Sequence, residues 1–174
     1  MTQRSTTRII GIDPGSRITG YGVIDAVGSD CRFVAAGCIR CGDGEFNDRL
    51  RRIYQQTGEL LREWMPQQMA VEQVFVSQNA GSALKLGAAR SAAICAGFEW
   101  PQLTLAEYAP REIKQAVTGT GGADKAQVQH MIKALLKLSG DLQADAADAL
   151  AVAVCHANSQ RLNRRLAEAM AGSA

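Results

Sequence analysis

The chain has 174 residues, a length typical of one domain that can bury a proper core. Hydrophobic residues make up 47% and charged residues 21%, and the formal net charge is only +2. The molecule as a whole is therefore no polycation, and a nucleic-acid surface would have to come from local clustering of charge. Residues 1–7 lack the apolar core of a signal peptide, and no run approaches the roughly 18 apolar residues of a membrane span. We expect a cytoplasmic protein without a membrane partner.

The five cysteines are an odd number, which argues against a disulfide scaffold. Cys38 and Cys41 form a CxxC, but they lie in a strand-like stretch, where positions three apart face opposite sides. A zinc site would also need a second such pair nearby, and the sequence has none. Reduced structural cysteines are the favoured interpretation.

Residues 8–16, RIIGIDPGS, place a lone carboxylate after an apolar run and directly before a Pro-Gly turn. Such a run predicts a buried strand in mid-sheet. Asp13 at its end is either a half-buried charge that needs a partner or a turn residue that bonds backbone N–H groups. Taken alone, the two interpretations are about equally supported.

Two further strands are predicted at 19–25 and 32–41, with a hairpin turn at 28–30. Together with residues 9–13 they would form an antiparallel meander in which the first strand lies innermost. The close glycines Gly20 and Gly22 suggest a bulge or a close approach of backbone.

A helix over 47–64 ends before Pro66, and an apolar strand over 69–75 follows with one carboxylate, Glu72. Asn79 is a plausible N-cap for a helix that runs to about residue 97. Its many alanines and glycines predict tight packing on the sheet, on a partner subunit, or on both.

The next predicted elements are a short strand at 103–105 and helices that begin at Pro110 and near Asp124. Residues 118–122 between these helices contain three glycines and are expected to be mobile. As a phosphate-binding loop this segment is a weak candidate, because it lacks the Gly-Lys-Ser/Thr ending.

The last core helix is predicted over about 144–158 and is apolar all round apart from its acids, so it is expected to be buried. Asp145 and Asp148 are three residues apart and share one face. The helix dipole contributes about 0.3–1 kcal/mol, which does not offset several kcal/mol of desolvation per ion, whereas a divalent cation would. N-terminal capping is the alternative, and it suits Asp145 better than Asp148.

We expect one domain over residues 1–158 and a basic C-terminal tail over 159–174. The tail contains Arg161, Arg164 and Arg165 and is expected to be a frayed helix. It is equally well interpreted as a phosphate contact or as a solvated face.

Four carboxylates from buried elements remain without an obvious basic partner: Asp13, Glu72, Asp145 and Asp148. Hard oxygen ligands suit Mg²⁺ or Mn²⁺ rather than zinc. Acids on rigid elements can hold two ions roughly 3.5–4 Å apart for phosphodiester cleavage. A glycosidase would need only two acids and an aromatic cleft, and aromatic residues are 5% of this chain.

The chain resembles the RuvC-type Holliday junction resolvases from about residue 9 to residue 156. The likeness is carried by six segments in order: GIDPGS (11–16), TGYGVI (19–24), VEQVF (71–75), NA-SALKLG (79–87), KAQVQHM (125–131) and QADAADALA (143–151). The resemblance implies an α/β, RNase H-like fold. Its five-stranded mixed sheet has three antiparallel and two parallel strands and is flanked by helices.

The resemblance also implies roles for particular residues. Asp13, Glu72, Asp145 and Asp148 match the catalytic, metal-binding acids, which would hold two Mg²⁺ per site, with Mn²⁺ as a substitute. The expected DNA contacts are Phe75, which would stack on bases, together with Asn79, Ser82, Lys114, Lys125 and the 119–122 loop.

The family acts in DNA recombination and repair as a homodimer that nicks a four-way DNA junction symmetrically, together with the RuvA and RuvB branch-migration complex. Two rival interpretations are less well supported by the sequence. Sugar kinases and actin-like ATPases share Gly-Ile-Asp-x-Gly but need two such domains, and a non-catalytic DNA-binding relative would not need all four acids. His156 lies about 12 Å along the helix from Asp148 and is not expected to be a direct ligand.

Overall fold

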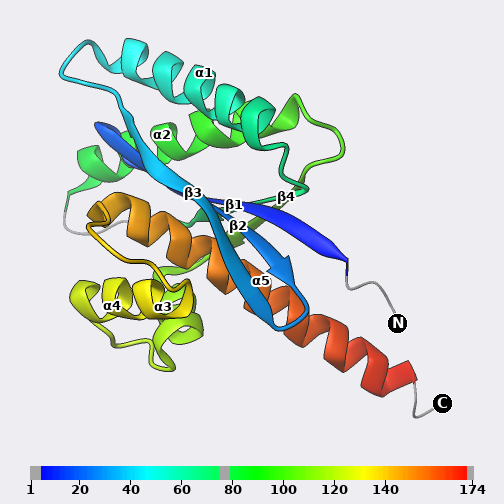
Figure 1. Cartoon of the computed structure of the whole chain (residues 1–174). Helices are drawn as coiled ribbons and strands as arrows, with labels where there is room; N and C mark the ends of the chain where they lie inside the picture. Colours follow the sequence, from blue (N-terminus) through cyan, green and yellow to red (C-terminus); the bar gives the residue numbers. More distant parts are fainter. Residues whose placement is uncertain (1–4, 75–78, 172–174) are drawn as a thin grey trace.

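The computed structural model describes residues 5–74 and 79–171 (Figure 1). One five-stranded sheet organises them, in the order β3-β2-β1-β4-β5. The strands are β1 (Thr6–Asp13), β2 (Ile18–Val27), β3 (Asp30–Arg40), β4 (Gln68–Glu72) and β5 (Thr104–Tyr108). β1, β2 and β3 are antiparallel neighbours, while β4 pairs in parallel with β1 and with β5. The predicted mixed sheet is confirmed, with β1 at its centre.

Helices cover both faces of this sheet (Figure 1). They are α1 (Phe46–Trp64), α2 (Ala80–Phe98), α3 (Pro110–Thr118), α4 (Lys125–Leu135) and α5 (Ala144–Ala171). α1 and α2 close one apolar core, to which β1 contributes Ile10 and Ile12. α3, α4 and α5 close the other, to which β1 contributes Ile9. Because β1 is covered on both faces, its central residues 9–12 are all apolar, whereas polar residues begin and end the strand.

α5 lies directly on the sheet because the strands beneath it carry glycines. A Cβ at Gly11 would be 2.2 Å from the carbonyl oxygen of Ala149, and one at Gly22 would be 2.7 Å from the nitrogen of Leu150. The close approach predicted for the second strand is therefore real. The register shift in this part of the sheet lies between Val23 and Ile24 rather than at the glycines.

α5 does not end near Asn158, so that predicted helix end is wrong. The helix continues to Ala171 because residues 159–171 contain no glycine or proline and consist mainly of good helix formers. Its final turns project beyond the sheet in Figure 1. Leu162, Leu166 and Met170 are exposed there at four-residue spacing. The boundary that we drew at residue 158 thus falls inside one helix.

Smaller differences concern strand ends and cysteines. β4 ends at Glu72, earlier than predicted. All five cysteines are free; Cys41 is buried just beyond the end of β3, whereas Cys38 is half-buried on it. No helix in the described part of the chain is long and apolar enough to cross a membrane.

Candidate active site

Asp13 and Glu72 end two neighbouring parallel strands. Ile12 of β1 pairs with Val71 of β4, so the two acids follow at the next register position and emerge at the same edge of the sheet. Both are partly buried, and their carboxyl groups hydrogen-bond to each other. Asp13 is therefore not simply a turn residue, because its carboxyl group interacts with that of a second acid.

Asp148 joins this pair from α5, which packs mainly on β1 and β2. Its side chain is 16% exposed. The three acids share one small cavity of about 110 Å³. Its lining consists of Asp13, Glu72, Pro110, Ile113, Lys114, Lys125, Val128, Asp148 and Ala151. The sequence predicted the charged members of this lining, whereas its apolar wall from α3 and α4 was missed.

Burial and crowding disfavour the charged state of the two strand acids. Burial raises the pKa of Asp13 to about 8, and the negative charges of Glu72 and Asp148 act in the same direction. Burial also raises the pKa of Glu72, although the hydrogen bond from Asp13 acts to lower it. Without a cation, the Asp13–Glu72 pair therefore retains a proton near neutral pH.

Two lysines face the same cavity from the helices above it. Lys125 is the first residue of α4, and its ammonium donates to Asp148 Oδ2 at 3.1 Å. Asp124 caps that helix by accepting from the backbone N–H of Gln127, which fixes the backbone at Lys125. Lys114 approaches from α3, where its positive charge lowers the pKa of Glu72. The structure thus brings both predicted lysines to the acids.

Asp145 is not part of the cavity lining, so the expected convergence of four acids is only partly observed. It lies in the first turn of α5, where its carbonyl oxygen packs against Gly20 of β2. Its charge acts on Cys38 of β3, whose pKa is raised by burial and by Asp145. Three residues along a helix leave the two side chains only about 60° apart around its axis. Asp145 lies outside the cavity lining because it is one turn earlier on α5, where the helix packs on β2.

The predicted DNA contacts at the start of α2 are exposed. Asn79 is the helix N-cap, as predicted, and its Oδ1 accepts from the backbone N–H of Ser82 at 3.1 Å. Phe75, the proposed stacking residue, lies outside the described residues.

The turn after Asp13 is closed by two hydrogen bonds of a buried threonine, which the sequence did not reveal. The fully buried Thr19 hydroxyl donates to the carbonyl oxygen of Gly15 at 2.8 Å and accepts from the Gly15 N–H at 3.2 Å. These two bonds stabilise the turn.

In the predicted loop at residues 118–122, Gly119 follows the last residue of α3 and has a φ of 80°, a conformation that favours glycine.

The donor set suits a hard divalent cation. Carboxylate oxygens from Asp13, Glu72 and Asp148 surround one cavity, and the raised pKa values of the first two show that their charge lacks compensation. Within residues 5–74 and 79–171, however, no three His, Cys, Asp or Glu side chains are grouped as ligands of one ion. Asp148 is instead engaged by Lys125.

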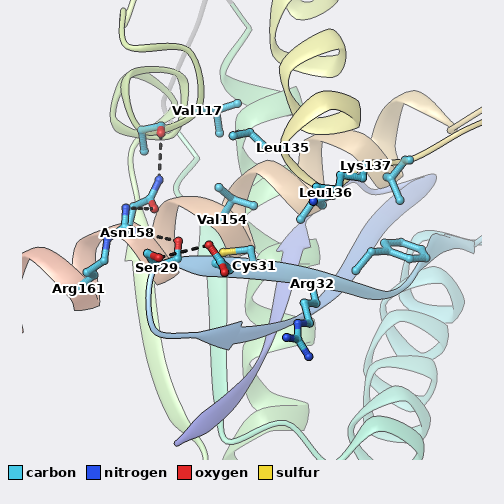
Figure 2. Close-up of a pocket in the computed structure, with 14 residues that line it drawn as sticks. Ser29, Cys31, Arg32, Val117, Leu135, Leu136, Lys137, Val154, Asn158 and Arg161 are labelled. Carbon is cyan, nitrogen blue, oxygen red and sulfur yellow. Dashed lines mark hydrogen bonds between the residues drawn. The ribbon is translucent and has the colours of Figure 1, made fainter. Parts of the chain in front are cut away.

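A larger cavity lies elsewhere, and its lining includes none of the candidate acids (Figure 2). It measures about 720 Å³ and lies between the β2–β3 hairpin, the ends of α3 and α4, and α5. Arg161 bridges its wall by donating to the Ser29 carbonyl oxygen at 2.7 Å and to Asn158 Oδ1 at 2.9 Å. This arrangement holds the hairpin against α5, and we assign the cavity no part in the chemistry.

His156 is fully buried on α5, with both ring nitrogens engaged. Nδ1 lies 2.8 Å from the Tyr108 hydroxyl, and Nε2 lies 2.9 Å from Gln68 Oε1. Burial lowers the pKa of His156 to about 4, so the ring is neutral. This agrees with the expectation that it does not act as a direct ligand.

A mixed five-stranded sheet with carboxylates at the ends of its central parallel strands defines an RNase H-like domain. The family model described as "Crossover junction endodeoxyribonuclease RuvC" matches residues 9–156. The chain belongs to this RuvC family.

Individual relatives agree with the family model. The chain is 57% identical over 152 residues to the crossover junction endodeoxyribonuclease RuvC of Stutzerimonas stutzeri, with 87% of each chain covered. It is 55% identical over 153 residues to that of Pseudoalteromonas translucida, covering 88% of this chain and 87% of the relative.

Solved structures show the same fold. Thermus thermophilus RuvC in complex with Holliday junction substrate is 31% identical, with a TM-score of 0.84, and the match covers 90% of this chain and 96% of that one. The yeast mitochondrial Holliday junction resolvase Ydc2, at 13% identity and a TM-score of 0.68 over 93% of this chain and 83% of that one, shares the fold.

Proposed function

We propose that this chain is a structure-specific endodeoxyribonuclease that resolves four-way DNA junctions in recombination and repair by metal-dependent hydrolysis of phosphodiester bonds. The family match over residues 9–156, with acids retained on both central strands and on α5, is the observation that carries the proposal. The similarity to a RuvC structure that contains a Holliday junction substrate supports the choice of substrate.

In this proposal Asp13, Glu72 and Asp148 bind the cation, and Asp145 contributes from the preceding turn of α5. Two Mg²⁺ per site are proposed, with Mn²⁺ as a substitute. When bound, the cation would favour attack of water on phosphorus and stabilise the departing oxygen. The chain itself holds the acids on rigid elements. Its apolar wall at Ile113 and Val128 limits the access of bulk water to them.

The DNA would be held by groups around the mouth of this cavity. Lys114 and Lys125 are placed beside the acids, where they can neutralise phosphates. Asn79 and Ser82 offer polar side chains at the exposed start of α2, whose N–H groups suit an anion. Stacking of Phe75 on an unpaired base, and contact of the 119–122 loop with the duplex, complete the proposal.

We propose that the enzyme works as a homodimer, because symmetric cutting of a junction needs two sites and this domain has one. An exposed apolar side chain in the first half of α2 supports this helix as the dimer interface. Leu84 is 75% exposed there and lines a cavity of about 490 Å³. A cytoplasmic location and cooperation with RuvA and RuvB complete this part of the proposal.

The test uses the purified full chain with a synthetic four-way junction and a linear duplex of the same sequence. We expect paired, ligatable nicks in the junction only, with Mg²⁺ or Mn²⁺ and not with EDTA. Glu72→Gln, which removes one charge at nearly constant volume, should bind the junction without cutting it. Equal cutting of the duplex, or undiminished cutting in EDTA, would contradict the proposal. Junction binding without any cutting would favour a non-catalytic scaffold.

A further inference from the structure

Lys125 forms an ion pair with one of the acids that the proposed function assigns to metal binding. Its Nζ lies 3.1 Å from Asp148 Oδ2, and within the described parts of the chain no other ion pair involves the four candidate acids. The two partners differ in environment, because the Lys125 side chain is 77% exposed and that of Asp148 is 16% exposed. One partner is fixed in the site, while the other extends into it from solvent.

The charge of Lys125 acts on the whole acidic cluster rather than on Asp148 alone. It lowers the pKa values of Asp13 and Glu72, against the stronger effect of burial. In return, the hydrogen bond and charge of Asp148 raise the pKa of Lys125, and Asp13 and Asp145 add to this effect. Lys125 thus interacts with all four acids.

The construction of α4 allows this side chain to move while its backbone stays fixed. Asp124 and Gln127 form a reciprocal capping box around the helix start, with bonds of 2.8 and 2.9 Å. The backbone of Lys125 is therefore anchored, whereas its four-carbon stem is largely exposed and free to change rotamer. The ammonium can leave Asp148 without disturbing the fold.

We propose that Lys125 is an exchangeable internal counter-ion of the active site. In the metal-free protein it occupies Asp148 and offsets part of the repulsion among the acids. A divalent cation must displace it from Asp148, so Lys125 sets the metal affinity as a positioning residue that acts through Asp148. The displaced ammonium is then available to a phosphate. This inference rests on the proposed metal-dependent function.

The pairing is consistent with the absence of a three-ligand group among the described residues, since Asp148 is directed to Lys125 instead of toward a shared ion. An ordinary surface ion pair would have a smaller effect on metal binding. Exposed pairs contribute little to stability, and a pair that formed only by chance proximity would not alter metal binding measurably.

The test is a titration of Mg²⁺ and Mn²⁺ into the metal-free protein, followed by calorimetry and by the melting temperature, without DNA. Lys125→Gln should bind metal about two- to fivefold more tightly than the parent, as expected for loss of a competing ion pair. In EDTA the same variant should melt below the parent, because the acids lose their counter-ion.

Two control variants separate exchange at Asp148 from a general charge effect. Lys125→Arg keeps a cation that can pair with Asp148, so its metal affinity should stay near that of the parent. Lys114→Gln removes a positive charge from the same cavity lining, where the described residues show no ion pair for Lys114. Its gain in metal affinity should be clearly smaller than that of Lys125→Gln.

Equal or weaker metal binding by Lys125→Gln would overturn the inference, as would equal gains in the two lysine-to-glutamine variants. Asp148→Asn provides a further check, because adding Lys125→Gln to it should no longer raise metal affinity. If the parent bound neither Mg²⁺ nor Mn²⁺, the proposed function itself would fail and the inference with it. The two failures are therefore distinguishable.

Discussion

The backbone of Gly20 on β2 packs against the carbonyl oxygen of Asp145 on α5, so that a Cβ added to this glycine would lie 2.0 Å from that oxygen. The contact joins backbone to backbone, and neither partner can move aside as a flexible side chain would. The contact therefore sets the distance between the first turn of α5 and the sheet. Because Asp148 follows one turn later, the same contact helps to determine where that acid meets Asp13 and Glu72.

We therefore predict that Gly20→Ala lowers the free energy of unfolding by about 1–3 kcal/mol, since overpacking at a rigid contact forces the backbone to shift. Metal affinity should fall as well, because the start of α5 moves relative to β1. Urea unfolding and metal titration would measure both effects. Gly58→Ala in α1 is a matched control, because its Cβ would meet only the Arg62 guanidinium at 3.6 Å. It should stabilise the protein by about 0.5–1 kcal/mol.

The pair of glycines in the second strand shows how far the sequence could be interpreted. Gly20 and Gly22 indicated a close approach, and one occurs, but the sequence could not tell that a helix over 120 residues later makes it. Hydrophobic periodicity was enough to predict which segments form strands and which form helices, because the periodicity reflects which side chains are buried. The end of α5 could not be predicted from hydrophobic periodicity, because residues 159–171 remain helical without a buried face.

The candidate site was predictable in composition but only partly in geometry. Buried acids at strand ends identified Asp13 and Glu72, since uncompensated charge is unfavourable there. The pairing of Lys125 with Asp148 depends on how α4 packs against α5, a long-range contact that leaves no local pattern. The same applies to Asp145, which shares a helix face with Asp148 but is left outside the cavity lining by the packing of the first turn of α5 on β2.

The acid pair predicts a pH dependence for the metal-free protein. Because burial raises the pKa of Asp13 to about 8, the native state keeps a proton that the unfolded chain has lost well below neutral pH. Stability should therefore fall as pH rises between the unfolded and folded pKa values. In EDTA we expect a loss of roughly 1 kcal/mol between pH 7 and 8, measured by urea unfolding.

Asp13→Asn should remove this loss, and saturating Mg²⁺ should also remove it, because the metal-bound state holds the carboxylates deprotonated. A parent protein whose stability in EDTA is flat or rises over this interval would show that Asp13 is already charged. The window avoids His156, whose effect has the opposite sign and lies at lower pH.

His156 predicts a separate loss of stability in acid. Its folded pKa of about 4 lies below the unfolded value of 6.5, so the unfolded chain binds the proton first. Stability should fall as pH decreases from about 6.5 to 4, by up to about 1.4 kcal/mol per pH unit from this group. Since Asp13 opposes this trend, the comparison is best made between Asp13→Asn and Asp13→Asn with His156→Gln. The double variant should be less stable at pH 7 but less sensitive to acid; identical acid sensitivity would refute the assignment.

The last prediction separates the two roles of Asn79, which caps α2 and is a proposed DNA contact. Its Oδ1 accepts from the Ser82 N–H, while its amide N–H₂ is on an exposed residue and donates to no protein group among the described residues. Asn79→Asp keeps the cap acceptor and adds a favourable charge at the helix start, so its melting temperature should equal or exceed that of the parent. It loses the donor and gains a charge that repels phosphate, so junction binding should weaken severalfold. Asn79→Ala should lose about 1 kcal/mol of stability because the cap is gone. If Asn79→Asp binds the junction as tightly as the parent across the salt range, Asn79 is a cap alone and the start of α2 does not meet DNA.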